Sequence, residues 1–147
     1  MIRGMPASLE RILRRLILAL LTFGLVATAG ELLALGHYKE SWQAVPIGCL
    51  IAALLIIVWH VVFGGAASLQ ALRFVMLVML IVGLTGVMLH FQSTRAFQLE
   101  ANPDLAGLPL VLRVLRAKSP PTLAPGAMVQ LGLLGLIYTF RHPMLKR

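Results

Sequence analysis

Residues 45–63, VPIGCLIAALLIIVWHVVF, contain no charged side chain. A helix of this length rises about 28 Å along its axis, close to the roughly 30 Å hydrocarbon core of a bilayer. Three further stretches, 13–35, 72–91 and 122–140, are similarly apolar and similarly long. The sequence therefore predicts four membrane-spanning segments in a single domain, residues 1–147.

The composition supports a membrane protein. Hydrophobic residues make up 59% of the chain and charged residues only 12%, whereas soluble domains typically have about 25% charged residues. Backbone groups in lipid must find hydrogen-bond partners within their own segment, so spans of this length should be helices. We expect an all-α polytopic membrane protein whose four transmembrane helices form an up-down-up-down bundle.

The first span has a second interpretation. Four arginines come before residue 16, and an apolar run then leads to the small-residue motif Ala27-Thr28-Ala29. This order is typical of a cleaved signal peptide. The apolar sequence resumes at 32–35, which favours an uncleaved span. Cleavage after residue 29 would leave three spans.

The distribution of Lys and Arg predicts the orientation, because cytoplasmic loops carry the excess of positive charge. Eight of the thirteen basic residues fall on one side: Arg3, Arg11, Arg14, Arg15, Arg73, Arg141, Lys146 and Arg147. The other five are Lys39, Arg95, Arg113, Arg116 and Lys118. We therefore expect both termini in the cytoplasm, and size and hydropathy favour a bacterial inner membrane. The net charge of +8 is spread over both faces and next to spans, which indicates lipid headgroups rather than nucleic acid as its partner.

The outer connection, residues 92–121, is long enough to carry function or structure of its own. Asn102-Pro103 and Pro109 stand where a helix could begin, since proline is favoured in a first helical turn. Four apolar side chains then share one face at helical spacing: Leu108, Val111, Leu112 and Leu115. Three basic side chains occupy the other: Arg113, Arg116 and Lys118. The pattern predicts a short amphipathic helix on the outer membrane surface or capping the bundle. A solvated charge cluster is the alternative.

Polar residues at membrane depth are candidates for a site. Glu31 is the only acid inside a span, about 22 Å along the first helix from Leu16, and a carboxylate there costs about 2.5 to 3.5 kcal/mol on insertion scales. Thr85 and Gln130 also lie in the outer halves of their spans. The three side chains could form a polar cluster, serving interhelical hydrogen bonds, a proton- or cation-coupled site, or a partner.

The four histidines form two pairs. His37 and His90 fall at outer helix ends, and His60 and His142 at inner ones. Haem b in a helical protein is held by two axial imidazoles from different helices, so either pair is a possible set of haem ligands. Interfacial histidines are the alternative interpretation.

Other chemistry has little support in the sequence. Cys49 is the only cysteine, so no intramolecular disulfide can form, and thiol-redox chemistry that needs cysteine pairs is excluded. Met76, Met79 and Met88 in the third span are expected to fill space rather than to bind metal. No metal site is predicted and no cofactor is expected, with haem kept only as the alternative for the histidine pairs. No nucleophile, phosphate-loop or zinc motif indicates an enzyme.

Glycines on three spans predict close helix packing, because small residues let backbones approach. They are Gly24 in the first span, Gly83 and Gly86 in the third, and Gly132 and Gly135 in the fourth.

These features favour a small non-enzymatic accessory or assembly subunit, which acts through helix packing and its outer loop on another membrane protein or on a second copy of itself. The first alternative is a small proton- or cation-coupled transporter using Glu31. The second is a haem b electron carrier using one of the histidine pairs.

Overall fold

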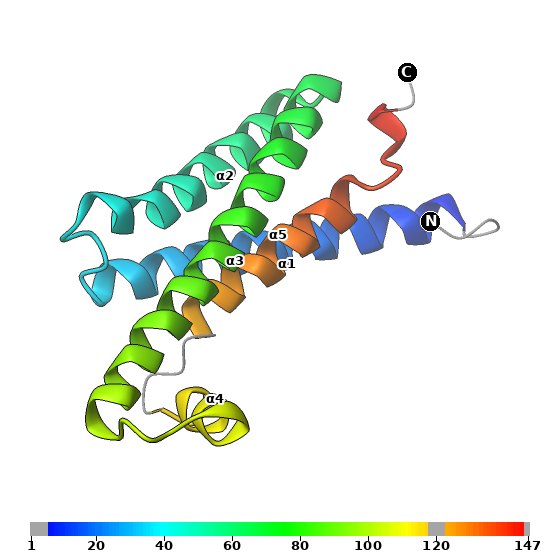
Figure 1. Ribbon diagram of the computed structural model, residues 1–147. Coiled ribbons are helices and arrows are strands. Elements are labelled where there is room, and N and C mark those ends of the chain that lie inside the picture. Colours follow the sequence, from blue (N-terminus) through cyan, green and yellow to red (C-terminus); the bar gives the residue numbers. More distant parts are fainter. Residues whose placement is uncertain (1–5, 118–122, 146–147) are drawn as a thin grey trace.

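The computed structural model describes residues 6–117 and 123–145. Within these ranges every regular element is a helix (Figure 1). The α-helices are α1 (Ala7–Ala34), α2 (Ala44–Phe63), α3 (Ala66–Ala101), α4 (Gly107–Leu115) and α5 (Leu123–Thr139), and the 3₁₀ helices are η1 (Ser41–Gln43) and η2 (Pro143–Leu145). The predicted all-α class is confirmed.

Three of these helices, α1, α2 and α3, are long and apolar enough to cross a membrane. The fourth expected span corresponds to α5, which has 17 residues and rises about 25 Å. That is at the lower limit for a transmembrane helix.

The bounds of α2 agree with the span predicted from hydropathy, whereas α3 is longer than its predicted span at both ends. Residues 92–101, which the sequence predicted as loop, continue α3 as helix. Six of these ten residues are Gln, Ala, Leu or Glu, which favour helix without being uniformly apolar. Asn102-Pro103 ends this helix rather than beginning another: Asn102 has φ −146° and ψ 84°, because a residue before proline avoids the α conformation.

The ends of the helices gather on two sides of the molecule. In Figure 1 the start of α1, the junction of α2 and α3, and the end of α5 lie on one side, here called the inner end. The 35–43 turn and α4 lie on the other side, here called the outer end. The α2–α3 junction contains only Gly64 and Gly65, both with positive φ (65° and 101°), so the chain reverses without a side-chain penalty.

The core is shared by α1, α2, α3 and α5 and contains fully buried side chains such as Leu25, Leu50 and Leu72. Met76 and Met79 are also completely buried there, as expected of flexible core side chains. Met88 is exposed, at 58%.

The helices α3 and α5 touch through their backbones. A Cβ atom placed on Gly132 would lie 2.9 Å from the carbonyl oxygen of Met76, and one on Gly83 would lie 2.9 Å from the carbonyl oxygen of Pro125. Gly86 and Gly135 face the same contact. The predicted use of glycine for close packing is confirmed on these two helices and at Gly24 of α1, where a Cβ atom would lie 2.5 Å from a side-chain carbon of Leu131. Gly30 of α1 has nothing within 4 Å of the corresponding position.

Replacing Gly132 by alanine should lower the stability of the protein. The added methyl group would push against the backbone of α3, and overpacking of this kind costs about 1–3 kcal/mol. Thermal unfolding in detergent, followed by circular dichroism, measures the effect. Gly30→Ala is the matched control and should leave the melting temperature unchanged or slightly higher. Equal melting temperatures for Gly132→Ala and the unmodified protein would contradict the close contact.

Candidate functional site

A cavity of about 520 Å³ lies at the outer end, where α1, α2, α3 and α5 meet. Its walls are mostly apolar, with Leu32 from α1, Val82 from α3 and Met128 from α5 among them. The polar side chains that line it are Glu31, His37, Trp42, Thr85 and His90. Size and lining are those of small-molecule sites, which are usually apolar clefts of roughly 300–1,000 Å³ with a few polar groups.

The end of α1 positions the first polar groups. Gly36 has a positive φ of 65°, and its N–H donates to the carbonyl of Leu33, while the N–H of His37 donates to that of Leu32. This pair of bonds is the Schellman arrangement, which needs a residue such as glycine in the left-handed region. This arrangement ends α1 at Ala34, about one turn after Glu31, and turns His37 back to the cavity.

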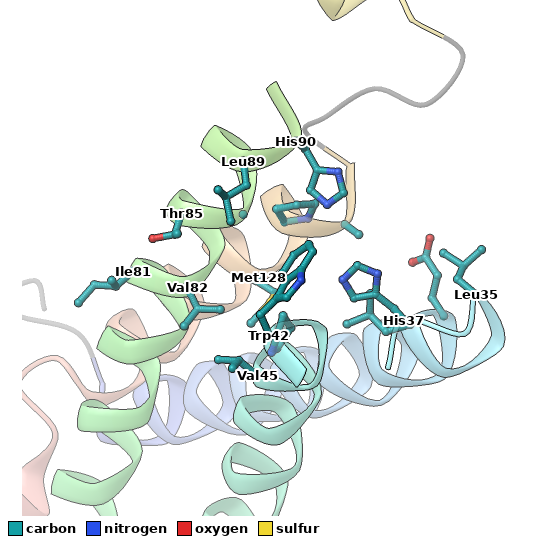
Figure 2. Close-up of a pocket in the computed structure, with 16 residues that line it drawn as sticks. Leu35, His37, Trp42, Val45, Ile81, Val82, Thr85, Leu89, His90 and Met128 are labelled. Carbon is teal, nitrogen blue, oxygen red and sulfur yellow. The ribbon is translucent and has the colours of Figure 1, made fainter. Parts of the chain in front are cut away.

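The outer histidine pair is brought together in this cavity. The ring centroids of His37 and His90 are 6.4 Å apart, with an interplanar angle of 22°. The ring of Trp42 stands edge-on to His37 at 6.4 Å, and its indole N–H donates to Glu40. Figure 2 shows His37, Trp42 and His90 grouped between the outer ends of the helices. Haem ligation by this pair stays a prediction, which a Soret absorption band of the purified protein would test.

The predicted polar trio is only partly gathered. Glu31 and Thr85 line the same cavity. Gln130 is exposed on α5 and is not among the residues that line it. Within the described part of the chain, no hydrogen bond joins these three side chains, so they do not form an interhelical hydrogen-bonded cluster.

The inner histidines belong to a buried network that the sequence did not indicate. The Nδ1 atom of His60 lies 2.9 Å from the Ser68 hydroxyl, and its Nε2 atom lies 3.0 Å from the Tyr138 hydroxyl. Ser68 itself donates to the carbonyls of Gly64 and Gly65. We infer from these donors that His60 carries its proton on Nδ1 and accepts the Tyr138 proton at Nε2.

This network decides what His60 can do. Both of its ring nitrogens have partners, so an axial bond to haem iron would have to break one of them. The ring of His142 packs 6.0 Å from that of His60. Ser68 is completely buried, which leaves its contact with His60 without access for a substrate. The arrangement ties α2, α3 and α5 together at the inner end.

Two arginines complete the inner end. Arg14 is only 7% exposed; it donates to the carbonyl oxygen of Tyr138 at 2.7 Å and pairs with Glu10 at 2.7 Å. Arg73 donates to the carbonyl oxygen of Thr139 at 2.9 Å. The last carbonyls of a helix lack partners and carry partial negative charge. Arg14 and Arg73 satisfy the last two carbonyls of α5, those of Tyr138 and Thr139. The sequence had assigned both arginines to the membrane surface.

The helix α4 is anchored to α3 by one face only. Leu110 and Val114 are buried, at 6% and 0% exposure. The adjacent face, the predicted apolar one, is open: Leu108, Val111, Leu112 and Leu115 are 68%, 37%, 40% and 45% exposed. Two basic side chains, Arg113 and Arg116, are exposed as well, and Lys118 lies outside the described residues. The predicted amphipathic helix is present, with an apolar stripe (Leu108, Val111, Leu112, Leu115) that the described part of the chain leaves uncovered.

His142, which follows α5 and packs against His60 and Tyr138, should make the stability of the protein depend on pH. The pKa of His142 is lowered to about 4, mainly by burial and to a smaller extent by the nearby charges of Arg14 and His60. The carboxylate of Glu10 acts in the opposite direction. The unfolded chain therefore binds this proton from about pH 6.5 downward, whereas the folded chain binds it only near pH 4. Stability should be complete above pH 6.5 and fall as the pH decreases from 6.5 to 4.

Melting temperatures in detergent over this pH range test the prediction. His142→Asn retains an acceptor for the Met144 N–H, which His142 Nδ1 binds at 3.3 Å, but cannot be protonated. Its melting temperature should fall less between pH 6.5 and 4 than that of the unmodified protein. Parallel curves for the two proteins would contradict the assignment to His142.

Comparison with known proteins adds no functional assignment: no protein-family model matches the chain, and neither a curated protein nor a solved structure is similar to it. The geometry of the described residues is therefore the ground for a functional proposal.

Proposed function

We propose that this protein is a small non-enzymatic subunit of a bacterial inner membrane, which works by docking against a membrane protein partner at its outer end. In this proposal α1, α2, α3 and α5 all cross the membrane, in up-down-up-down order, with both termini in the cytoplasm. The greater number of basic residues on the inner side supports this orientation. The start of α1 and the end of α5 lie on the same side of the molecule in Figure 1, which supports placing both termini on one side of the membrane.

The apolar stripe of α4 is the observation that carries the docking proposal. The 36 residues of α3 rise about 54 Å, well beyond the roughly 30 Å hydrocarbon core. Its polar last turns, 92–101, stand outside that core, and α4 follows them and packs on α3. In this proposal α4 stands outside the core as well, so a partner protein rather than hydrocarbon covers its exposed apolar stripe. Such a stripe beside basic residues is typical of a protein interaction site.

A photoreactive residue in place of Leu112 tests the docking. In intact membranes, irradiation should join it to one discrete protein, either a partner or a second copy of the chain. The matched control is the same substitution at Arg113, which lies about 100° around α4 from Leu112 and off the apolar stripe, and which should give little product. Leu112→Glu should also reduce co-purification after gentle solubilisation, because it places a charge in an apolar contact. A partner-free monomer whose only adducts are to lipid would contradict the proposal.

The outer cavity favours a second candidate, a small proton- or cation-coupled transporter that uses Glu31. A carboxylate within a membrane span raises the free energy of insertion and usually marks a functional site. Glu31 lines a cavity formed by four helices. In this function Glu31 would exchange a proton for a cation.

Proteoliposomes filled with the pH indicator pyranine test the second candidate. Adding a quaternary ammonium salt outside should change the internal pH when the unmodified protein is present. Glu31→Gln should abolish the response, whereas Glu100→Gln, which removes an exposed acid of α3 outside the cavity, should preserve it. A response that survives Glu31→Gln would rule out this function.

A further inference from the structure

We propose that the outer cavity is a binding site for an organic cation, an apolar molecule with a single positively charged group, which pairs with the Glu31 carboxylate. The proposal concerns binding alone. It requires neither docking through α4 nor transport, so it can fail or succeed independently of both.

The charge of the cavity differs from that of the whole molecule. The chain has a net charge of +8, yet the residues that line the cavity include one carboxylate, that of Glu31, and no lysine or arginine. A second carboxylate stands at the same corner, because Glu40 accepts the indole N–H of Trp42. Lys39, also in this turn, lies against Gly36. Glu31 is an exposed member of this lining. The apolar walls beside it exclude part of the solvent and so strengthen the field of its carboxylate, and the cavity should therefore select positive charge.

The aromatic lining suits an organic cation. Since the indole N–H of Trp42 is occupied by Glu40, Trp42 offers the cavity its ring rather than a donor. Cations bind favourably over a tryptophan ring. The nearly parallel rings of His37, from the 35–43 turn, and His90, from α3, extend the aromatic lining.

The rest of the cavity lining favours a ligand with a large apolar part over a metal ion. Apolar side chains, including those of proline and alanine, form most of the surface, and the volume of about 520 Å³ is far larger than an ion needs. Within the described ranges, no group of three or more histidine, cysteine or acidic side chains is placed to hold a metal ion. Shape and charge together fit a molecule with a hydrophobic frame and one positive centre.

Tetraphenylphosphonium and tetraphenylborate test the proposal, because they share a shape and differ in the sign of their charge. Trp59 is the only tryptophan besides Trp42, so the Trp59→Phe protein reports on the cavity through the fluorescence of Trp42 alone. Tetraphenylphosphonium should quench this fluorescence saturably, beyond its partition into protein-free micelles. Tetraphenylborate should not saturate. Glu31→Gln should weaken tetraphenylphosphonium binding at least about tenfold, which corresponds to about 1.4 kcal/mol.

Three further variants in the same background keep the test decisive. Glu100→Gln, outside the cavity, should bind as the parent does. Glu31→Asp keeps the charge and should retain most of the affinity, which separates loss of charge from misfolding. Val45→Phe narrows the cavity at a half-exposed position and should weaken binding without touching the acid. Equal binding of the two probes, or undiminished cation binding by folded Glu31→Gln, would overturn the proposal.

Discussion

The backbone contact between α3 and α5 is the constraint on which the rest of the structure depends. Gly83 and Gly132 bring the two helices so close that no Cβ atom fits between them, and α5 also packs against α1. This contact sets the register of α5. Its first turns, with Met128, line the outer cavity, and its last turn places Tyr138 against His60. A shift of one turn would disrupt both ends together.

The sequence predicted helix bounds correctly where an apolar run and a helix cover the same residues. It failed where a helix continues into polar residues. Residues 45–63 gave the bounds of α2 almost to the residue, because an uncharged apolar run has one structural solution in a bilayer. Residues 92–101 were expected to be loop because they are polar, yet local helix propensity continues α3 through them. Periodicity found α4 and its apolar stripe, but it did not show that Leu110 and Val114 would anchor it.

The sequence predicted most of the outer candidate site and none of the hydrogen bonds at the inner end. Glu31, Thr85 and the His37–His90 pair were expected in the outer half, and the structure gathers them in one cavity, while Gln130 lies elsewhere. The inner network could not be foreseen, because Arg14 and Arg73 have the positions of ordinary interfacial cations. Their partners are backbone carbonyls at the end of α5. Such partners have no signature in the sequence, since they depend on how the helices cross.

The place of α5 in the chain has a consequence for biogenesis. Transmembrane helices insert first and pack afterwards, and the short turns after α1 and α2 allow α1, α2 and α3 to associate as soon as they are inserted. The last helix follows only after α4, and the cavity gains the wall that includes Met128 when it docks. The cavity is therefore completed only when α5 is in place, and a chain that stalls before that step would lack the wall that α5 supplies.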